Sequence, residues 1–163
     1  VGLRLINVGI ETTDPEVAKL NKRLLIQQEH QEKIIKYCDK IGVKICAFYI
    51  LGLPSDTMES MRATLRYAIK LNTIIARFSV ATPYPGTLFF DQLQKEGKIL
   101  TDNYEKYSQF NVVFKHDHLT PQQVQKRLIY TYLRYYFRIG YFLMVLNYLS
   151  QKLFRQIKFR KSK

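Results

Sequence analysis

Three apolar segments, separated by stretches with helical periodicity, constrain the fold more than any other feature of this sequence. They span residues 3–11, 43–51 and 73–82. The middle segment is almost continuously apolar and does not alternate with polar residues, as expected of a strand covered on both faces. Strands that alternate with helices in this way predict parallel βαβ units in an α/β fold.

The two segments between these strands each carry an apolar stripe at helical spacing. The first stripe ends before Gly42, which suits a helix C-cap. For the second helix we expect Asp56 as the N-cap and Glu59 as its capping-box partner. The stripes consist of Ile34, Ile35, Cys38 and Ile41, and of Met58, Met61, Leu65, Ala68 and Ile69.

The rest of the chain changes in character after the third strand. A turn rich in proline and glycine (83–86) precedes a short helix at about 88–96, and an irregular strap follows over 103–118. Thr120, Pro121 and Gln123 predict a capped helix start, with a helix running to about Ile139 and broken by Gly140. We therefore expect three parts: 1–102 with the strands, 103–139 with the strap and long helix, and 140–163 as a basic amphipathic tail helix.

Charge is unevenly distributed. The chain has 26 lysines and arginines against 13 aspartates and glutamates, and every charged residue from 152 to 163 is basic. An excess of positive charge favours anionic partners. We expect the tail to lie on the protein or on a membrane surface, because the apolar run 139–149 is far shorter than the roughly 20 residues of a membrane-spanning helix. The protein is expected to be cytoplasmic, with peripheral membrane contact through this tail.

Cysteine and histidine do not form a metal-binding pattern. Cys38 and Cys46 are eight positions apart in apolar surroundings, which predicts two buried side chains in a reducing compartment. His30, His116 and His118 are not arranged as ligands of one ion.

Ligands of parallel α/β proteins bind at the carboxyl ends of the strands. Glu11 follows the first strand and could accept hydrogen bonds from an ammonium group or a ribose diol, or could simply be a solvated residue that opens a loop. Gly52 and Pro54 follow the second strand, where they leave room for a ligand or merely form a turn.

Taken in order, these strand ends resemble the radical S-adenosylmethionine superfamily. The segments are GIETTDPEVAKLNK (9–22), FYILGLPSDTMES (48–60) and FSVATPYPGTLFF (78–90). The similarity is to the cobalamin-binding-domain branch that includes anaerobic magnesium-protoporphyrin IX monomethyl ester cyclases. It implies a partial (β/α)6 barrel of the TIM type, of which this chain would hold strands four to six and the α-helical region that follows.

The resemblance also implies roles for particular residues at a cofactor site. Glu11 would contact the ribose or methionine part of S-adenosylmethionine, beside Thr12, where the family usually has serine. The adenine would lie against the second and third strand ends. These positions are Ile50, Leu51, Gly52, Ser79, Ala81 and Thr82.

Four departures from the family pattern stand out. Thr13 and Ser55 replace glycines, and Asp56 replaces a glutamate. Since β-branched Thr13 tolerates positive φ poorly, we expect the loop after Glu11 to follow a path of its own. The cluster motif C-x3-C-x2-C is absent, so the ligands of a 4Fe-4S cluster would lie outside this chain.

Two functions remain in view at this point. The resemblance implies part of an oxidoreductase or methyltransferase that uses S-adenosylmethionine, a 4Fe-4S cluster and, in this branch, cobalamin. The chain alone would be inactive and would need the N-terminal half of the barrel as its partner. The substrate would be a small molecule such as a tetrapyrrole or lipid. The aromatic residues of the strap, which are Tyr104, Tyr107, Phe110 and Phe114, would suit such a substrate but suit an ordinary core better. The alternative is a non-catalytic basic module that binds RNA or anionic membrane. Helical spacing, however, places Leu128, Tyr132 and Tyr135 or Tyr136 on one packed stripe, which disfavours nucleic acid.

Overall fold

A computed structural model describes residues 2–23 and 27–161 of the chain, with side chains described as far as residue 150. Three strands form one sheet in the order β1-β2-β3: β1 (Leu5–Glu11), β2 (Lys44–Leu51) and β3 (Ile75–Val80). Both pairings are parallel. The predicted set of three adjacent parallel strands is therefore confirmed, with boundaries within two residues of those expected.

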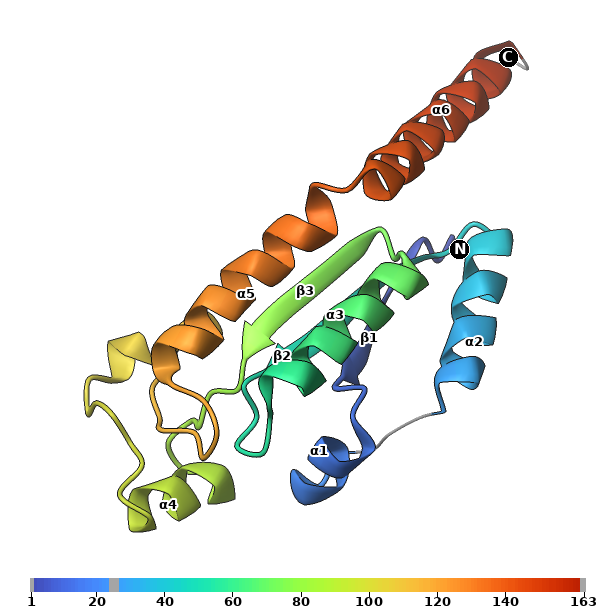
Figure 1. Ribbon diagram of the computed structural model, residues 1–163. Helices are drawn as coiled ribbons and strands as arrows, with labels where there is room; N and C mark the ends of the chain where they lie inside the picture. The colour runs from blue at the N-terminus through green and yellow to red at the C-terminus, as the bar shows by residue number, and fades with distance from the viewer. Residues whose placement is uncertain (1, 24–26, 162–163) are drawn as a thin grey trace.

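Two crossover helices connect the strands, as the periodicity predicted (Figure 1). They are α2 (Gln28–Lys40), which ends just before Gly42 with φ +80°, and α3 (Met58–Leu71). A further short helix, α1 (Pro15–Leu20), lies between β1 and α2 and was not predicted. It starts at Asp14, whose carboxylate accepts the N–H groups of Glu16 and Val17.

The predicted N-cap of α3 was wrong by one residue. Thr57 caps the helix, and its partner in the capping box is Ser60. Asp56 is buried and accepts hydrogen bonds from Leu53 N and Ser60 Oγ instead. Glu59 is exposed and pairs with Arg66. The prediction failed because aspartate and threonine are both favourable N-caps, aspartate slightly more so, and only the loop geometry decides between two adjacent candidates.

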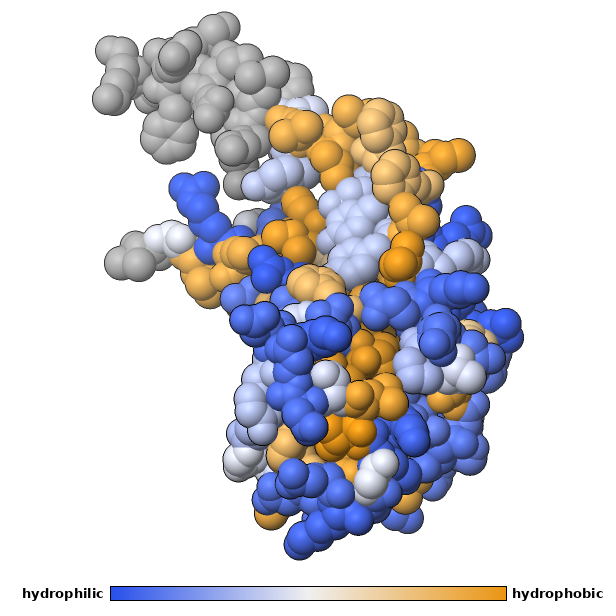
Figure 2. All heavy atoms as spheres, turned by 90° about the vertical axis from the view of Figure 1, so that its left-hand side faces the viewer, coloured by the Kyte–Doolittle hydropathy of each residue, from blue (hydrophilic) through white to orange (hydrophobic). Residues whose placement is uncertain are grey.

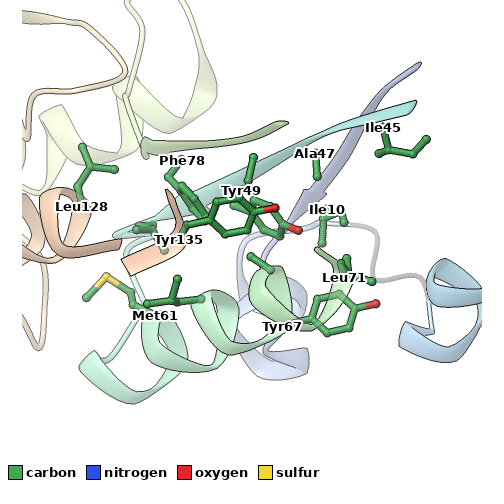
Figure 3. Packing of buried hydrophobic residues seen from close by; sticks show 14 of the residues in the cluster. Ile10, Ile45, Ala47, Tyr49, Met61, Tyr67, Leu71, Phe78, Leu128 and Tyr135 are labelled. Atoms are coloured by element: carbon green, nitrogen blue, oxygen red, sulfur yellow. The ribbon is translucent and has the colours of Figure 1, made fainter. Parts of the chain in front are cut away.

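The main core lies between one face of the sheet and the helices α3 and α5 (Pro121–Tyr136). Figure 3 shows Ile10, Ala47, Tyr49 and Phe78 projecting from the sheet toward α3 and Tyr135. The Tyr49 and Phe78 rings stack with centroids 5.1 Å apart. Both cysteines are buried, as predicted.

A second apolar cluster covers the carboxyl end of the sheet. It joins α1, the loop after β2, the end of β3, α4 (Leu88–Lys95) and the strap. The strap is irregular, as predicted, apart from the short 3-10 helix η1 (Tyr104–Lys106) and one bridge between Ile99 and Phe114. The members of the cluster are Val17, Leu53, Ala81, Leu93 and Phe114.

The long helix α5 starts at the predicted capping box of Thr120 and Gln123. It ends at Tyr136, and α6 (Ile139–Lys161) follows after a short break and extends beyond the sheet (Figure 1). The break therefore precedes Gly140, which lies inside α6. Arg138 fixes the junction between the two helices by donating hydrogen bonds to Tyr135 O and Asn72 Oδ1. The charged side chains of 152–163 lie outside the described residues, and no described helix is long and apolar enough to cross a membrane.

The outer edge of β3 is satisfied by side chains of α5. The hydroxyl of Tyr136 accepts from Ala76 N (3.1 Å) and donates to Ala76 O (2.7 Å). The hydroxyl of Tyr132 does the same at Phe78, with distances of 3.1 and 2.8 Å. Two tyrosines one helical turn apart thus replace the neighbouring strand that β3 lacks.

Candidate functional site

The candidate site lies on the face of the sheet that is turned away from the main core. Strand residues alternate between the two faces of a sheet. Because Tyr49 and Phe78 lie in the core, their neighbours Phe48 and Arg77 lie on the opposite face, called here the open face. The Arg77 guanidinium lies 5.7 Å from the centroid of the Phe48 ring. Toward the carboxyl end, Ile50 and Ser79 pair on this same face.

Glu11 lies on this open face at the end of β1. The register of β1 shifts between Gly9 and Glu11, and Glu11 has φ +64°. A Cβ atom on Gly9 would stand 3.8 Å from Glu11 Cγ, so the glutamate side chain extends over Gly9. Its carboxylate is half-exposed and meets Arg23 Nη1 at 3.4 Å. The predicted position of Glu11 at the mouth of the strands agrees with this geometry.

The two threonines after Glu11 turn away from solvent. Thr12 is buried, and its hydroxyl accepts a hydrogen bond from Asp14 N at 3.3 Å. Thr13 is also buried, with its hydroxyl 3.4 Å from that of Thr64 on α3. The left-handed residue of this loop is Glu11 and not Thr13, so Thr13 fits without strain. The side chain of Thr12 therefore braces the loop and does not lie beside the Glu11 carboxylate.

The end of β2 divides between the two faces. Ile50 is half-buried on the open face, whereas Leu51 is fully buried in the main core and can offer a ligand only its backbone. Gly52 has φ +68°, and a Cβ there would stand 2.6 Å from Val124 Cγ1. Glycine is thus required at this position by both backbone conformation and close packing with α5.

His116 of the strap holds the same loop, a role that the sequence did not reveal. Its Nε2 donates to Gly52 O at 2.7 Å, and its ring lies 4.2 Å from that of Phe114. Burial lowers the pKa of His116, because it disfavours the charged form of the ring. In the sequence, His116 had been considered only as a metal ligand. The described residues hold no group of three or more His, Cys, Asp or Glu that could bind an ion.

Asp56 anchors the loop from its other side. Its carboxyl accepts from Leu53 N at 2.9 Å and from Ser60 Oγ at 2.5 Å. Burial raises the pKa of Asp56 to about 6, although these hydrogen bonds act in the opposite direction. The loop after β2 is therefore held by one group on the strap and one at the start of α3.

The end of β3 contributes mainly backbone groups to the candidate site. Ser79 lies on the open face, and its hydroxyl donates to Tyr49 O at 3.3 Å. Ala81 is buried in the second cluster, and its N–H donates to Leu51 O. The Thr82 hydroxyl is within hydrogen-bonding distance of Ser108 O and Val80 O.

Of the predicted site residues, the structure thus brings Glu11, Ile50 and Ser79 together on one face. The arrangement places a carboxylate, an apolar side chain and a hydroxyl across three neighbouring strand ends. A carboxylate can accept both hydroxyl groups of a diol, and an apolar side chain can pack on a flat base. The remaining predicted residues can contribute mainly their backbone, because Thr12, Leu51 and Ala81 are buried, the Thr82 hydroxyl is bonded to backbone carbonyls and Gly52 has no side chain.

Comparison with known proteins gives relatives that share most of this chain. An uncharacterized methyltransferase of Pyrococcus horikoshii is 31% identical over 137 residues, covering 84% of this chain and 30% of the relative. The bacteriochlorophyllide d C-8(2)-methyltransferase of Chlorobaculum tepidum is 26% identical, with 83% and 30% covered. The anaerobic magnesium-protoporphyrin IX monomethyl ester cyclase of Rubrivivax gelatinosus is 28% identical, with 81% and 24% covered. No family model matches the chain.

Solved structures agree on the fold. Coproporphyrinogen III oxidase (HemN) from Escherichia coli, a radical SAM enzyme, superimposes with a TM-score of 0.56 at 21% identity, covering 83% of this chain and 26% of that one. The radical S-adenosylmethionine methyltransferase TsrM from Kitasatospora setae gives a TM-score of 0.52 at 19% identity, with 77% and 26% covered. The chain spans under a third of the length of these relatives. By sequence and by fold, it is a relative of the radical S-adenosylmethionine enzymes, in the branch with the anaerobic magnesium-protoporphyrin IX monomethyl ester cyclases, and corresponds to the C-terminal part of their barrel.

Proposed function

We propose that this chain forms the ribose and adenine side of an S-adenosylmethionine site in a radical S-adenosylmethionine enzyme. The observation that carries the proposal is the common face of Glu11, Ile50 and Ser79 at the carboxyl ends of three parallel strands. Glu11 would accept hydrogen bonds from the ribose diol, and Ile50 would pack on the adenine. The loop at Gly52, held by His116 and Asp56, would border the base with backbone alone.

The residues present do not suit an iron-sulfur cluster. Cys38 is on α2 and packs in the main core, and Cys46 is buried on β2, so neither can join a set of three thiolate ligands. We therefore assign the 4Fe-4S ligands to sequence outside this chain, and expect the chain alone to be inactive. When bound, cluster and S-adenosylmethionine would supply the radical or methyl-transfer chemistry, and this chain would bind, orient and shield the nucleoside.

The N-terminal part of the barrel is the partner that this arrangement requires. The outer edge of β1 has no neighbouring strand in the described chain, and Leu5, Asn7 and Gly9 are exposed beside it. An unpaired strand edge is a template for a further strand. Pairing there would extend the sheet toward the closed barrel and would screen Glu11 from bulk water, which strengthens its hydrogen bonds.

The reaction and substrate are proposed only at the level of class. Relatives named as methyltransferases and cyclases of tetrapyrroles favour a flat, lipophilic small molecule, with cobalamin as an additional cofactor in the methyltransferase case. Of the strap aromatics, Tyr107 and Phe114 are buried and serve packing. Tyr104 and Phe110 are exposed, so they are available to a substrate.

The test uses the full-length protein with its cluster. Glu11→Ala should weaken S-adenosylmethionine binding in calorimetry by roughly 10- to 100-fold, the usual worth of a hydrogen bond to a charged group. Iron content should not change, because the carboxylate is assigned to the nucleoside. The matched control is Glu16→Ala, which removes an exposed carboxylate from α1 near the same loop. Unchanged affinity in Glu11→Ala would remove Glu11 from the site, and loss of iron would reassign it to the cluster.

A further inference from the structure

The C-terminal helices expose large apolar side chains in a regular pattern. Along α5 and its C-cap residue these side chains recur at every fourth position, and on α6 at intervals of three or four, so each helix carries one exposed apolar stripe. Figure 2 shows apolar side chains gathered in the upper part of the molecule, whereas the lower part is largely hydrophilic. The two stripes, called here the C-terminal apolar face, consist of Ile129, Leu133 and Phe137, and of Ile139, Phe142, Leu143, Leu146 and Leu149.

The other sides of the same helices are already occupied by packing. Tyr135 donates a hydrogen bond to Thr73 O, and Tyr141 donates one to Ile74 O. Met144 and Tyr148 line a cavity of about 280 Å³ at the amino ends of β2 and β3, and the Lys44 ammonium lies 5.5 Å from the Tyr148 ring centroid. The apolar face is therefore not the packing side of these helices. Its two stripes meet at the junction between the helices, where Phe137 is 85% and Ile139 is 79% exposed.

The charge of this region defines the kind of surface that it fits. Residues 120–163 contain ten lysines and arginines and no aspartate or glutamate, whereas residues 1–119 contain 16 basic and 13 acidic residues. Lys126 and Arg134 of α5 are exposed and have no acidic partner among the described residues. Apolar side chains flanked only by positive charge are typical of helices that lie in the interface of an anionic bilayer.

We propose that α5 and α6 dock on the surface of an anionic membrane through the C-terminal apolar face. Phe137, Ile139 and Phe142 enter the boundary between headgroups and acyl chains, and the basic side chains bind lipid phosphates. Because α6 packs at the amino ends of β2 and β3, its part of this contact lies at the opposite end of the sheet from Glu11, whereas α5 starts near the carboxyl end, where Val124 packs at Gly52. The proposal does not depend on the cofactor site.

Vesicle co-sedimentation tests the proposal with the purified protein. Wild-type protein should bind phosphatidylcholine vesicles that contain phosphatidylserine, and should bind phosphatidylcholine alone much more weakly. The double variant Phe137→Ser, Phe142→Ser should lose at least about tenfold in affinity. Lys126→Gln and Arg134→Gln should each lose roughly fivefold, on the anionic vesicles only. Leu88→Ser is the matched control, since Leu88 on α4 is also 85% exposed but lies outside the apolar face.

Three results would overturn the proposal. Equal binding to neutral and anionic vesicles, or to neither, contradicts an electrostatic membrane contact. Equal losses in the Leu88→Ser control and the double variant contradict the location. If ultracentrifugation shows a dimer that only the double variant disperses, and no vesicle binding is found, the face is an interface between copies of this chain. Circular dichroism of each variant verifies that the helices are retained.

Discussion

The two outer edges of the sheet differ in what bonds to their backbone groups. Along β3, the hydroxyls of Tyr132 and Tyr136 bond to the free N–H and C=O groups, and the strap carbonyl of Gln109 accepts from Val80 N. Along β1, no strand of the described chain occupies the outer edge. A sheet stops where its edge groups are satisfied and can grow where they are not. The difference identifies β3 as a finished edge and β1 as an edge that can accept a further strand.

The largest expected effect on the free energy of unfolding comes from removing the hydroxyl groups that bond to the edge of β3. Replacing both Tyr132 and Tyr136 with phenylalanine keeps the rings but leaves the N–H and C=O groups of Ala76 and Phe78 without partners. Each lost hydroxyl should cost about 1–3 kcal/mol, so the pair should lower the free energy of unfolding by about 2–6 kcal/mol. Urea denaturation measures this difference.

A matched control is available on the same helix. Tyr130 is half-exposed on α5, and its ring lies under Arg127, away from β3. Tyr130→Phe should change the free energy of unfolding by less than about 0.5 kcal/mol. If the double variant and Tyr130→Phe have similar effects, the hydroxyls do not close the edge and β3 is not distinguished from β1.

The helix α5 and the strand β3 could be predicted from the sequence better than the contacts between them. Helical spacing placed Tyr132 and Tyr135 or Tyr136 on the packed side of α5, and the packing is confirmed. It could not show that two hydroxyls would match alternate residues of β3, because that match depends on how the helix and strand lie along each other. His116 was missed for a similar reason, since it bonds to a carbonyl 64 residues away from an irregular segment that has no period to analyse.

At the strand ends, too, the position of a residue could be predicted from the sequence, whereas its backbone conformation and burial could not. The position of Glu11 at the mouth of β1 could be predicted from the apolar run before it. Its positive φ could not, since glutamate gives no sequence signal for a left-handed backbone. The helix cap was misplaced from Thr57 to Asp56, because burial of the aspartate is a tertiary property.

An intermediate effect on the free energy of unfolding is expected from Asp56, in the loop that follows the middle strand β2. Burial raises the pKa of Asp56 from 3.8 to about 6, so the folded state holds its proton more tightly than the unfolded state does. The stabilisation from this proton is complete below pH 3.8 and is lost as the pH rises through about 6. The change should amount to about 3 kcal/mol over that window. Asp56→Asn should remove it.

Urea denaturation at a series of pH values measures this slope. The control is Asp91→Asn, which replaces an exposed aspartate on α4 and should leave the slope in place. If Asp56→Asn retains the full pH dependence, the carboxyl of Asp56 is not the group responsible, and the loop after β2 is not anchored as its hydrogen bonds indicate.

The smallest effect on stability is expected at the open edge, and its sign is the informative part. Glu11 holds φ +64°, a conformation that costs a non-glycine residue about 1 kcal/mol or more. Its exposed ion pair with Arg23, at 3.4 Å, returns little of that cost. Glu11→Gly should therefore leave the free energy of unfolding unchanged or raise it by up to about 1 kcal/mol.

Strain kept at a residue that does not stabilise the fold points to a role in binding. Lys22→Gly provides the comparison, because Lys22 also has positive φ, at +51°, and its side chain is exposed. Both glycine variants should unfold at equal or higher urea concentration than the wild type. Only Glu11→Gly should weaken S-adenosylmethionine binding in the full-length protein. If Glu11→Gly instead destabilises the protein by more than about 1 kcal/mol, the carboxylate supports the fold of the open edge, and its strained backbone gives no argument for a ligand.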